Sequence, residues 1–290
     1  MKIYHLLFIL LLVSCQKEVD FDFDQYEKKV VIEAALTNQT GPQWVRLSYL
    51  SRNFGTNASY VQVDDYIGNA VVKLSDDQGN EYTYTKYIDQ SETFKGYYKF
   101  DNVNAQPNRT YTLNVTVDGK TYTARDYMNE VPVITNVKTE RMESEIPGKQ
   151  SFYVPLISFD NPSKQMYYLM SHQNPQYELM ENTIGNNSRS WPFLIFDNQQ
   201  LNREVRDLRV TDHSPEGTNF LTYSPGETVR VYLYSISKKA YDFYDALIRQ
   251  YYNDGGAFQP SPASAPSNFN NGAIGFFRVS AASTKDKVVR

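Results

Sequence analysis

Apolar and polar residues alternate with a period of two through the first half of the chain. The run from Tyr111 to Val117 alternates cleanly, Asp118-Gly119 follows, and the alternation resumes from Lys120 to Ala124. Asp-Gly between two such runs predicts a β-hairpin, because both turn residues readily adopt positive φ. Further short strands are expected at 28–36, 43–50, 70–74, 82–85 and 96–100. Roughly seven short strands without a helical period predict an immunoglobulin-like β-sandwich over residues 28–131. The term refers only to the layout of the strands, because the chain lacks the cysteine pair of antibody domains.

The second half of the chain is also expected to be mostly β. Proline interrupts strand pairing, so Val131-Pro132-Val133 is the expected boundary, and residues 132–290 are predicted to form a second β-rich domain. Its expected strands are 152–159, 165–171, 203–210, 228–234 and a closing strand at 273–280, with a compact apolar run at 191–196.

One segment of this second domain has a helical period. Ala240, Tyr244, Leu247 and Tyr251 fall on one stripe, which predicts an amphipathic helix at about 239–253. Ser237 is the expected N-cap, and Gly255-Gly256 is the expected stop. Packing on a sheet face is the expected role of this helix, and binding to a partner or a membrane surface is the alternative.

The N-terminus has the pattern of a secretory signal. A short basic head precedes the apolar run Leu6–Val13, which is too short to cross a bilayer. Leu12-Val13-Ser14-Cys15 resembles the bacterial lipobox, which predicts a lipoprotein signal peptide at 1–14 and lipid attachment to Cys15. Residues 15–27 then form a lipidated acidic tether. A lysine and acidic residues directly after Cys15 resemble the surface-export signal of lipoproteins in one Gram-negative lineage, and a simple solvated tether is the alternative.

Composition excludes several classes of protein. The net charge is only −4 with 21% charged residues, which argues against a nucleic-acid binder. Hydrophobic residues at 41% and aromatic residues at 14% argue against general disorder. One cysteine and three histidines leave almost no material for a transition-metal site, so no metal and no cofactor is expected.

The sequence marks no catalytic residue. Nucleophile-elbow, phosphate-loop, dinucleotide and zinc-protease motifs are absent. His172 and His213 remain as possible general bases, and an ordinary surface or capping role is expected for each. Two carboxylates that meet only in space would leave no sequence signal, so a hydrolase stays open at this point.

Aromatic residues in or beside predicted loops are the candidate binding residues. Trp191, Phe193, Phe258 and Phe269 are assigned to a speculative contact surface, because aromatic side chains anchor sugars and protein partners. The alternative for each ring is a place in the core beneath a loop. Trp44 lies in an alternating strand and is expected to be buried.

Several of these pieces resemble one family. The lipobox, the hairpin at 111–122, the Val-Pro boundary, the helix entry at 235–244 and the ending Asn271-Gly272-Ala273-Ile274-Gly275-Phe276-Phe277 are similar to the lipoproteins named domain of unknown function 4249. The resemblance implies an outer-membrane lipoprotein from a lineage rich in TonB-dependent nutrient transporters.

The function expected from the sequence is therefore a binding role at the outer membrane. The protein is predicted to be lipid-anchored, to face the cell exterior, to lack enzymatic activity and to assist a TonB-dependent transporter in nutrient uptake. A surface hydrolase acting on polysaccharide or peptide is one alternative, and a structural envelope or adhesion protein is another. The sequence identifies no small-molecule ligand.

Overall fold

The computed structural model describes residues 28–50, 66–88, 95–143, 151–173, 193–210, 223–252 and 264–290. The predicted signal peptide and tether lie outside these ranges. The described chain is mostly β, as the sequence predicted. The strands of its first half are β1 (Val30–Thr37), β2 (Gln43–Tyr49), β3 (Val71–Asp76), β4 (Glu81–Lys86), β5 (Tyr97–Phe100), β6 (Arg109–Val117) and β7 (Lys120–Met128).

These strands form an immunoglobulin-like sandwich. They run in the orders β1-β2-β5 and β4-β3-β6-β7, and the short pairing of β4 with β5 joins the two sets. Alternate residues of both sets meet in one core, which includes Ile32, Leu47, Leu74 and Leu113. The predicted Asp118-Gly119 hairpin is confirmed, with φ values of 47° and 80° in the turn between β6 and β7.

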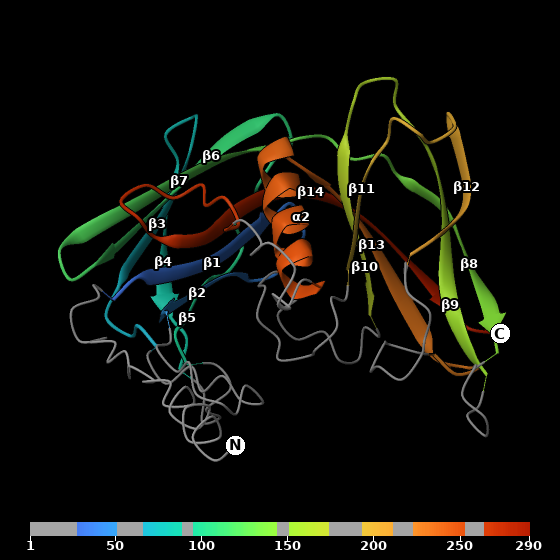
Figure 1. The fold of residues 1–290 in the computed structure, drawn as a ribbon, viewed down its shortest axis with the longest axis horizontal. Coiled ribbons are helices and arrows are strands. Elements are labelled where there is room, and N and C mark those ends of the chain that lie inside the picture. Colours follow the sequence, from blue (N-terminus) through green and yellow to red (C-terminus); the bar gives the residue numbers. More distant parts are fainter. Residues whose placement is uncertain are drawn as a thin grey trace, which may run out of the picture.

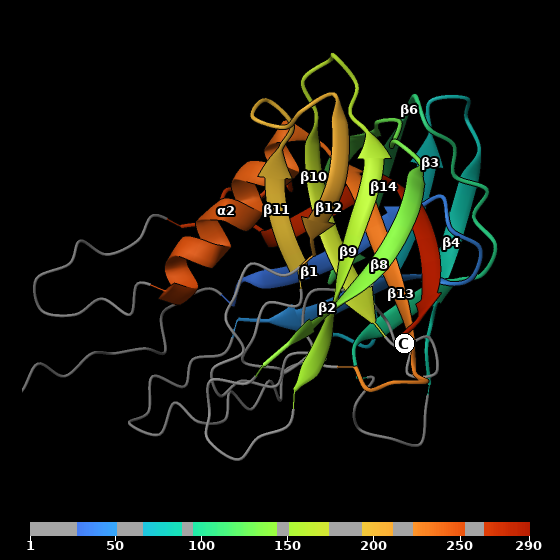
Figure 2. The same ribbon diagram turned by 90° about the vertical axis from the view of Figure 1, so that its right-hand side faces the viewer.

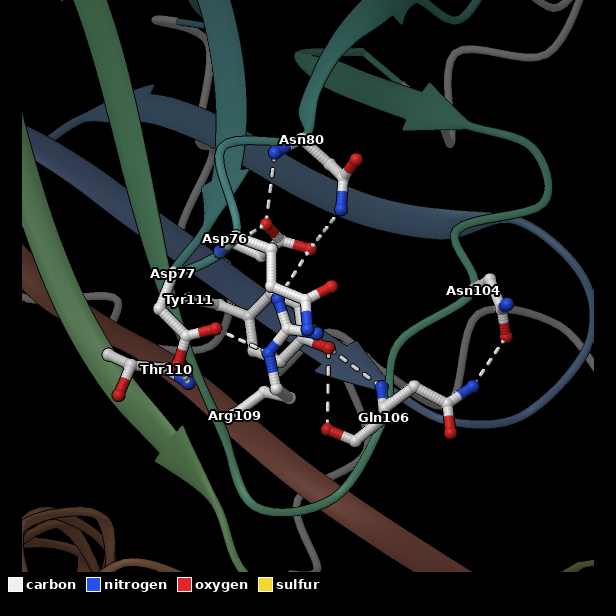
Figure 3. Close-up of polar contacts among 9 residues, drawn as sticks. Asp76, Asp77, Asn80, Asn104, Gln106, Arg109, Thr110 and Tyr111 are labelled. Carbon is white, nitrogen blue, oxygen red and sulfur yellow. Dashed lines mark hydrogen bonds and ion pairs between the residues drawn. The ribbon is translucent and has the colours of Figure 1, made fainter.

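Tyr111 fixes the corner that leads into β6. Its hydroxyl accepts a hydrogen bond of 2.7 Å from the Gln106 N–H and lies 3.3 Å from the Gln106 carbonyl oxygen (Figure 3). The ring is buried in the core. A buried tyrosine whose hydroxyl bonds to the backbone a few residues upstream is the tyrosine corner of immunoglobulin-like sandwiches.

The second half adds two sheets and a helix. Its elements are β8 (Ile134–Met142), β9 (Phe152–Asp160), β10 (Tyr167–Gln173), β11 (Phe193–Asp197), β12 (Glu204–Arg209), β13 (Thr228–Ile236), α2 (Lys238–Tyr252) and β14 (Ile274–Val288). Strands β12-β9-β8 form a separate sheet, which Figure 2 shows in front of β10, β13 and β14. A second core, with Ile157, Phe159, Met170 and Leu233, fills the space between these two layers.

Helix α2 covers the other face of β10 and β13 (Figure 1). Its buried residues Ala240, Phe243 and Tyr244 pack against strand residues that include Tyr234 and Phe276. The predicted N-cap is confirmed, because the Ser237 hydroxyl accepts a hydrogen bond of 3.1 Å from the Ala240 N–H. The helix is therefore part of the core packing rather than a separate amphipathic surface.

Strand β14 is longer than predicted and belongs to both halves. Residues 274–280 pair in parallel with β1, and residues 281–288 pair antiparallel with β13. Strands β11 to β7 thereby form one continuous 11-stranded sheet. The sequence-based division at residues 131 and 132 assigns all of β14 to the second domain. In the structure, residues 264–281 contribute Phe269, Phe277 and Val279 to the first core.

Side chains satisfy the backbone of β14 where it changes partners. Asn268 bonds both the N–H and the carbonyl oxygen of Phe277, and the Val279 N–H donates to the Asp126 carboxylate at 2.9 Å. On the opposite edge, Asn38 accepts a hydrogen bond from the Ala282 N–H. Unpaired strand edges invite pairing with other chains, and these side chains close the edge at this point.

The ending that resembles the family signature has a structural role. Asn271 and Gly272 both adopt positive φ in the turn before β14. Gly275 has a φ of +108°, and a Cβ there would lie 2.1 Å from the carbonyl oxygen of Ile32. Only glycine permits this close approach of β14 to β1.

Candidate functional site

The structure describes two of the four predicted aromatic anchors, Phe269 and Phe193, and places them in different surroundings. Phe269 is buried, 7% exposed, in the first core, where it bridges to Ala124 of β7. Phe193 begins β11, is half-buried, and packs edge to face on Tyr244 of α2 with 5.2 Å between ring centroids. Trp191 and Phe258 lie outside the described residues, as does Cys15. We do not retain Phe269 as a binding anchor, because its ring is not available at the surface.

A group of charged and aromatic side chains lies instead on the outer face of the first sandwich. Strands β14, β1, β2 and β5 direct these side chains away from the first core, and register places Glu33 opposite Arg46 and Arg46 opposite Tyr97. We call this group the outer-face cluster; it consists of Glu33, Trp44, Arg46, Tyr97 and Arg278. It is continuous with the surface that α2 covers, since Phe276 lies opposite Glu33 and packs on the helix.

Glu33 and Arg46 form the central ion pair of the cluster. Arg46 Nη1 lies 3.1 Å from Glu33 Oε2. The Arg46 side chain is 12% exposed and the Glu33 side chain is 19% exposed. Burial raises the pKa of the Glu33 carboxyl to about 7, and the Arg46 guanidinium opposes that rise. The Arg46 guanidinium also lies 5.7 Å from the ring centroids of Tyr66 and Tyr97, where a cation is stabilised by the aromatic faces.

Arg278 is the most deeply buried charge of the cluster. It is 4% exposed, and its guanidinium lies 4.9 Å from the Tyr234 ring centroid and 6.0 Å from that of Tyr244. Its Nε has no hydrogen-bond partner, and none of the ion pairs in the described ranges includes it. The two tyrosine rings therefore stabilise the buried guanidinium through cation–π contacts.

Trp44 completes the aromatic side of the cluster. It is buried, as expected, but it lies on the outer face rather than beside Val45 and Leu47 in the first core. Tyr87 and Tyr97 meet it edge to face at 5.1 and 6.1 Å between ring centroids. The outer face of this sandwich is therefore packed and aromatic, whereas the exposed face of an isolated sandwich is usually polar.

Asp126 joins this region to the first sandwich. Burial raises the pKa of its carboxyl to about 6, while hydrogen bonds from Val279, Ser237 and Tyr127 and the charge of Lys239 lower it. Ser237 is also the N-cap of α2, so one carboxyl holds both the edge of β14 and the start of the helix. The groups that set the pKa values of Glu33 and Asp126 include no second carboxylate.

Adjacent carboxylates do occur at Asp76 and Asp77, at the end of β3 (Figure 3). Asp76 accepts hydrogen bonds from the backbone of Gln78 and Asn80, and Asp77 accepts one of 2.9 Å from the Thr110 N–H. Both pair with Arg109, and the pKa of each is lowered, chiefly by hydrogen bonds. Two carboxylates held ionised in this way fix the β3–β4 turn, and neither is suited to donate a proton.

His172 is a core residue. It is 6% exposed, and its Nδ1 lies 2.8 Å from the Tyr223 hydroxyl in the second core. Burial lowers the pKa of the imidazole to about 4, so the ring is neutral at pH 7. The other candidate base, His213, lies outside the described residues.

Among the residues that the structure describes, no three His, Cys, Asp or Glu side chains gather in a way that could hold a metal ion. No described helix combines the length and the apolar character needed to cross a membrane.

The sequence carried a partial signal for the outer-face cluster. Alternation in β2 already put Trp44 and Arg46 on one face, opposite Val45 and Leu47. Glu33 and Arg278 interrupt runs of apolar residues, but their placement on neighbouring strands depends on the parallel contact of β1 with β14, which joins residues more than 240 positions apart. Local patterning contains no information on such a contact.

Comparison with known proteins establishes the family. The family model for DUF4249, a domain of unknown function, matches residues 16–286, so the chain belongs to that family. No curated protein matches the sequence. Among solved structures, the chain is similar to the FN1–FN3 domains of chicken CNTN1, with 11% identity and a TM-score of 0.21. The match covers 71% of this chain and 60% of that chain.

Proposed function

We propose that this protein is a lipid-anchored, non-enzymatic binding protein of the outer membrane that faces the cell exterior and assists a TonB-dependent transporter in nutrient uptake. The observation that carries the proposal is Leu12-Val13-Ser14-Cys15. The only cysteine of the chain stands where a lipobox requires it, directly after a short apolar run. Acyl chains on that cysteine give a stable membrane anchor without a membrane-spanning segment.

The chemistry of the described residues favours binding over hydrolysis. Glu33 is paired with Arg46, Asp126 is bonded to backbone and Ser237, and Asp76 and Asp77 are both held by Arg109. Glycoside hydrolysis by the usual route needs two carboxyl groups that face each other across the scissile bond. These four carboxyls are each engaged in holding strands or turns together, so none of them supplies the catalytic pair that the alternative hydrolase function would need.

Co-purification tests the partner. An affinity-tagged copy would replace the native gene, intact cells would be cross-linked, and the protein would be purified from outer membranes for mass spectrometry. We expect enrichment of an outer-membrane β-barrel transporter of the TonB-dependent class. The matched control is Cys15→Ala, which should lose the transporter because it is no longer held at the membrane.

Two outcomes would overturn this function. One is a purified protein that hydrolyses polysaccharide or peptide substrates, which would favour the hydrolase. The other is a cross-linked sample in which no TonB-dependent transporter is enriched over the Cys15→Ala control.

A further inference from the structure

One end of the first sandwich lies where the chain enters the described fold. Lys28 and Lys29 directly precede β1, and the Lys29 carbonyl accepts a hydrogen bond of 2.9 Å from the Leu50 N–H at the end of β2. Lys28 Nζ lies 5.3 Å from the centroid of the Tyr49 ring. The Tyr49 hydroxyl bonds to Asp118 at 3.1 Å, which brings the β6–β7 turn to the same end.

Lysines and exposed apolar side chains gather there. Lys28, Lys29 and Lys120 are all exposed, and Lys120 lies next to the turn that contains Asp118. Leu50 is 49% exposed and Val71, which begins β3, is 51% exposed. Asp118, an acidic residue at the same end, is hydrogen-bonded to Tyr49 and Asn69. Three ammonium groups beside two exposed aliphatic side chains match the chemistry of a lipid headgroup region, which offers phosphates above an apolar layer.

This end of the sandwich is the one that follows the proposed anchor in the sequence. Thirteen residues, 15–27, separate the start of the tether from Lys28. Fully extended, thirteen residues span at most about 45 Å. Strand β1 enters the sandwich from this end, so the end that carries Lys28 is the part of the sandwich closest along the chain to the anchor.

We infer that Lys28, Lys29, Lys120, Leu50 and Val71 form a membrane-contact surface whose lysines bind phosphate groups of lipid headgroups. This inference rests on the lipid anchor proposed above. Contact at this end would hold the sandwich upright on the tether and would direct the second half of the molecule away from the bilayer. The electrostatic part of the interaction is set by the lysines, and the exposed Leu50 and Val71 supply shallow apolar contact.

Vesicle binding tests the surface without the anchor. The mature chain with Cys15→Ser, produced without its signal peptide, would be sedimented with vesicles of equal parts phosphatidylglycerol and phosphatidylcholine. We expect binding that weakens with salt, because exposed charges are screened. The triple variant Lys28→Gln, Lys29→Gln, Lys120→Gln should bind about 100-fold more weakly, at about 1 kcal/mol per lysine. The acidic tether remains in every variant, so any competition with the lysines is included in the measurement.

A matched variant controls for net charge. Lys138→Gln, Lys164→Gln, Lys285→Gln removes three exposed lysines of the second half and should leave vesicle binding unchanged. Equal loss in both triple variants, equal binding to pure phosphatidylcholine, or no vesicle binding at all would overturn the inference. Palmitate labelling of Cys15 reports separately on the anchor, so failure of the contact surface and failure of the proposed anchor give different results.

Discussion

The backbone N–H of Val279 donates a hydrogen bond of 2.9 Å to the carboxylate of Asp126, which lies 153 residues earlier in the chain. This contact joins the C-terminal strand β14 to β7, the last strand of the first sandwich. Because Asp126 also accepts a hydrogen bond from Ser237, the same carboxyl contacts the N-cap of α2. The two halves of the molecule are therefore linked by a buried polar contact in addition to the shared sheet.

Replacement of Asp126 tests this link. Asp126→Ala leaves the buried Val279 N–H without an acceptor, so we expect the free energy of unfolding to fall by about 3 kcal/mol. Asp126→Asn retains an acceptor oxygen and should cost less. Urea denaturation monitored by tyrosine fluorescence measures both. The exposed Asp101→Ala is the control and should stay within about 0.5 kcal/mol of the wild type; equal losses in Asp101→Ala and Asp126→Ala would contradict this role.

The Glu33 carboxyl predicts a pH dependence of stability. Its pKa is about 7 in the folded protein against an ordinary value of 4.5, so the folded state binds more protons between these values. Stability contributed by this group is therefore lost as pH rises from about 4.5 to 7. Glu33→Gln lacks this dependence, and its free energy of unfolding relative to the wild type should increase by about 3 kcal/mol across that window.

Measuring the difference between Glu33→Gln and the wild type removes other titrating groups. The pKa of Asp126 is also raised by folding, to about 6, so its contribution to stability also falls as pH rises. The pKa of His172 is lowered by folding, to about 4, so its contribution to stability increases as pH rises. Both are present in the two proteins and cancel in the comparison. A difference that stays constant from pH 5 to pH 8 would show that Glu33 is not held in a low-dielectric environment.

The tyrosine corner predicts a cost for the loss of one hydroxyl. Tyr111→Phe removes the acceptor of the Gln106 N–H and should lower the free energy of unfolding by about 2 kcal/mol. Tyr127→Phe is the matched control, because its hydroxyl bonds at the surface to Asn108. We expect its effect to be within about 0.5 kcal/mol. Thermal melting of both variants measures the difference. An equal shift in the two melting temperatures would contradict a stabilising role for the Tyr111 hydroxyl.

Three of the four aromatic candidates should divide into core and surface residues. Phe269→Ala removes a buried ring from the first core and should cost about 3 kcal/mol or more of stability. Trp191→Ala and Phe258→Ala are predicted to cost little stability and to reduce co-purification of the partner. Thermal melting and pull-down from native membranes distinguish the two groups. Stability lost in all three variants with an unchanged set of co-purifying proteins would return Trp191 and Phe258 to the core as well.

The elements that the sequence predicted correctly are those with a strong local signal. The Asp118-Gly119 hairpin, the strands around Leu47 and Val231, and the Ser237 cap all follow from turn chemistry and residue periodicity. The second part of β14 was missed, because residues 281–288 read Ala-Ala-Ser-Thr-Lys-Asp-Lys-Val and become mostly exposed toward the end. Strand β8, with the charged residues Lys138, Glu140 and Arg141, was missed for the same reason.

The site residues depended on contacts that local patterns do not encode. Glu33 meets Arg46 through a neighbouring strand, which alternation could have indicated, but Arg278 joins them through the parallel pairing of β1 with β14. Phe269 was assigned to the speculative contact surface because it lies in or beside a predicted loop, with a place in the core beneath that loop as the alternative. In the structure the same segment lies along β7, with the Asn270 N–H bonded to the Thr123 carbonyl oxygen, and this places the ring inside the sandwich.

Metabolic labelling with radioactive palmitate tests the central claim most directly, because the proposed function depends on the anchor at Cys15. Cells that express the wild type and the Cys15→Ala variant would be labelled, fractionated and immunoprecipitated. The account predicts label on the wild-type protein in the outer-membrane fraction, with no label on Cys15→Ala and its release from membranes or arrest as an unprocessed precursor. A Cys15→Ala protein that still incorporates palmitate and remains in the outer membrane would contradict it.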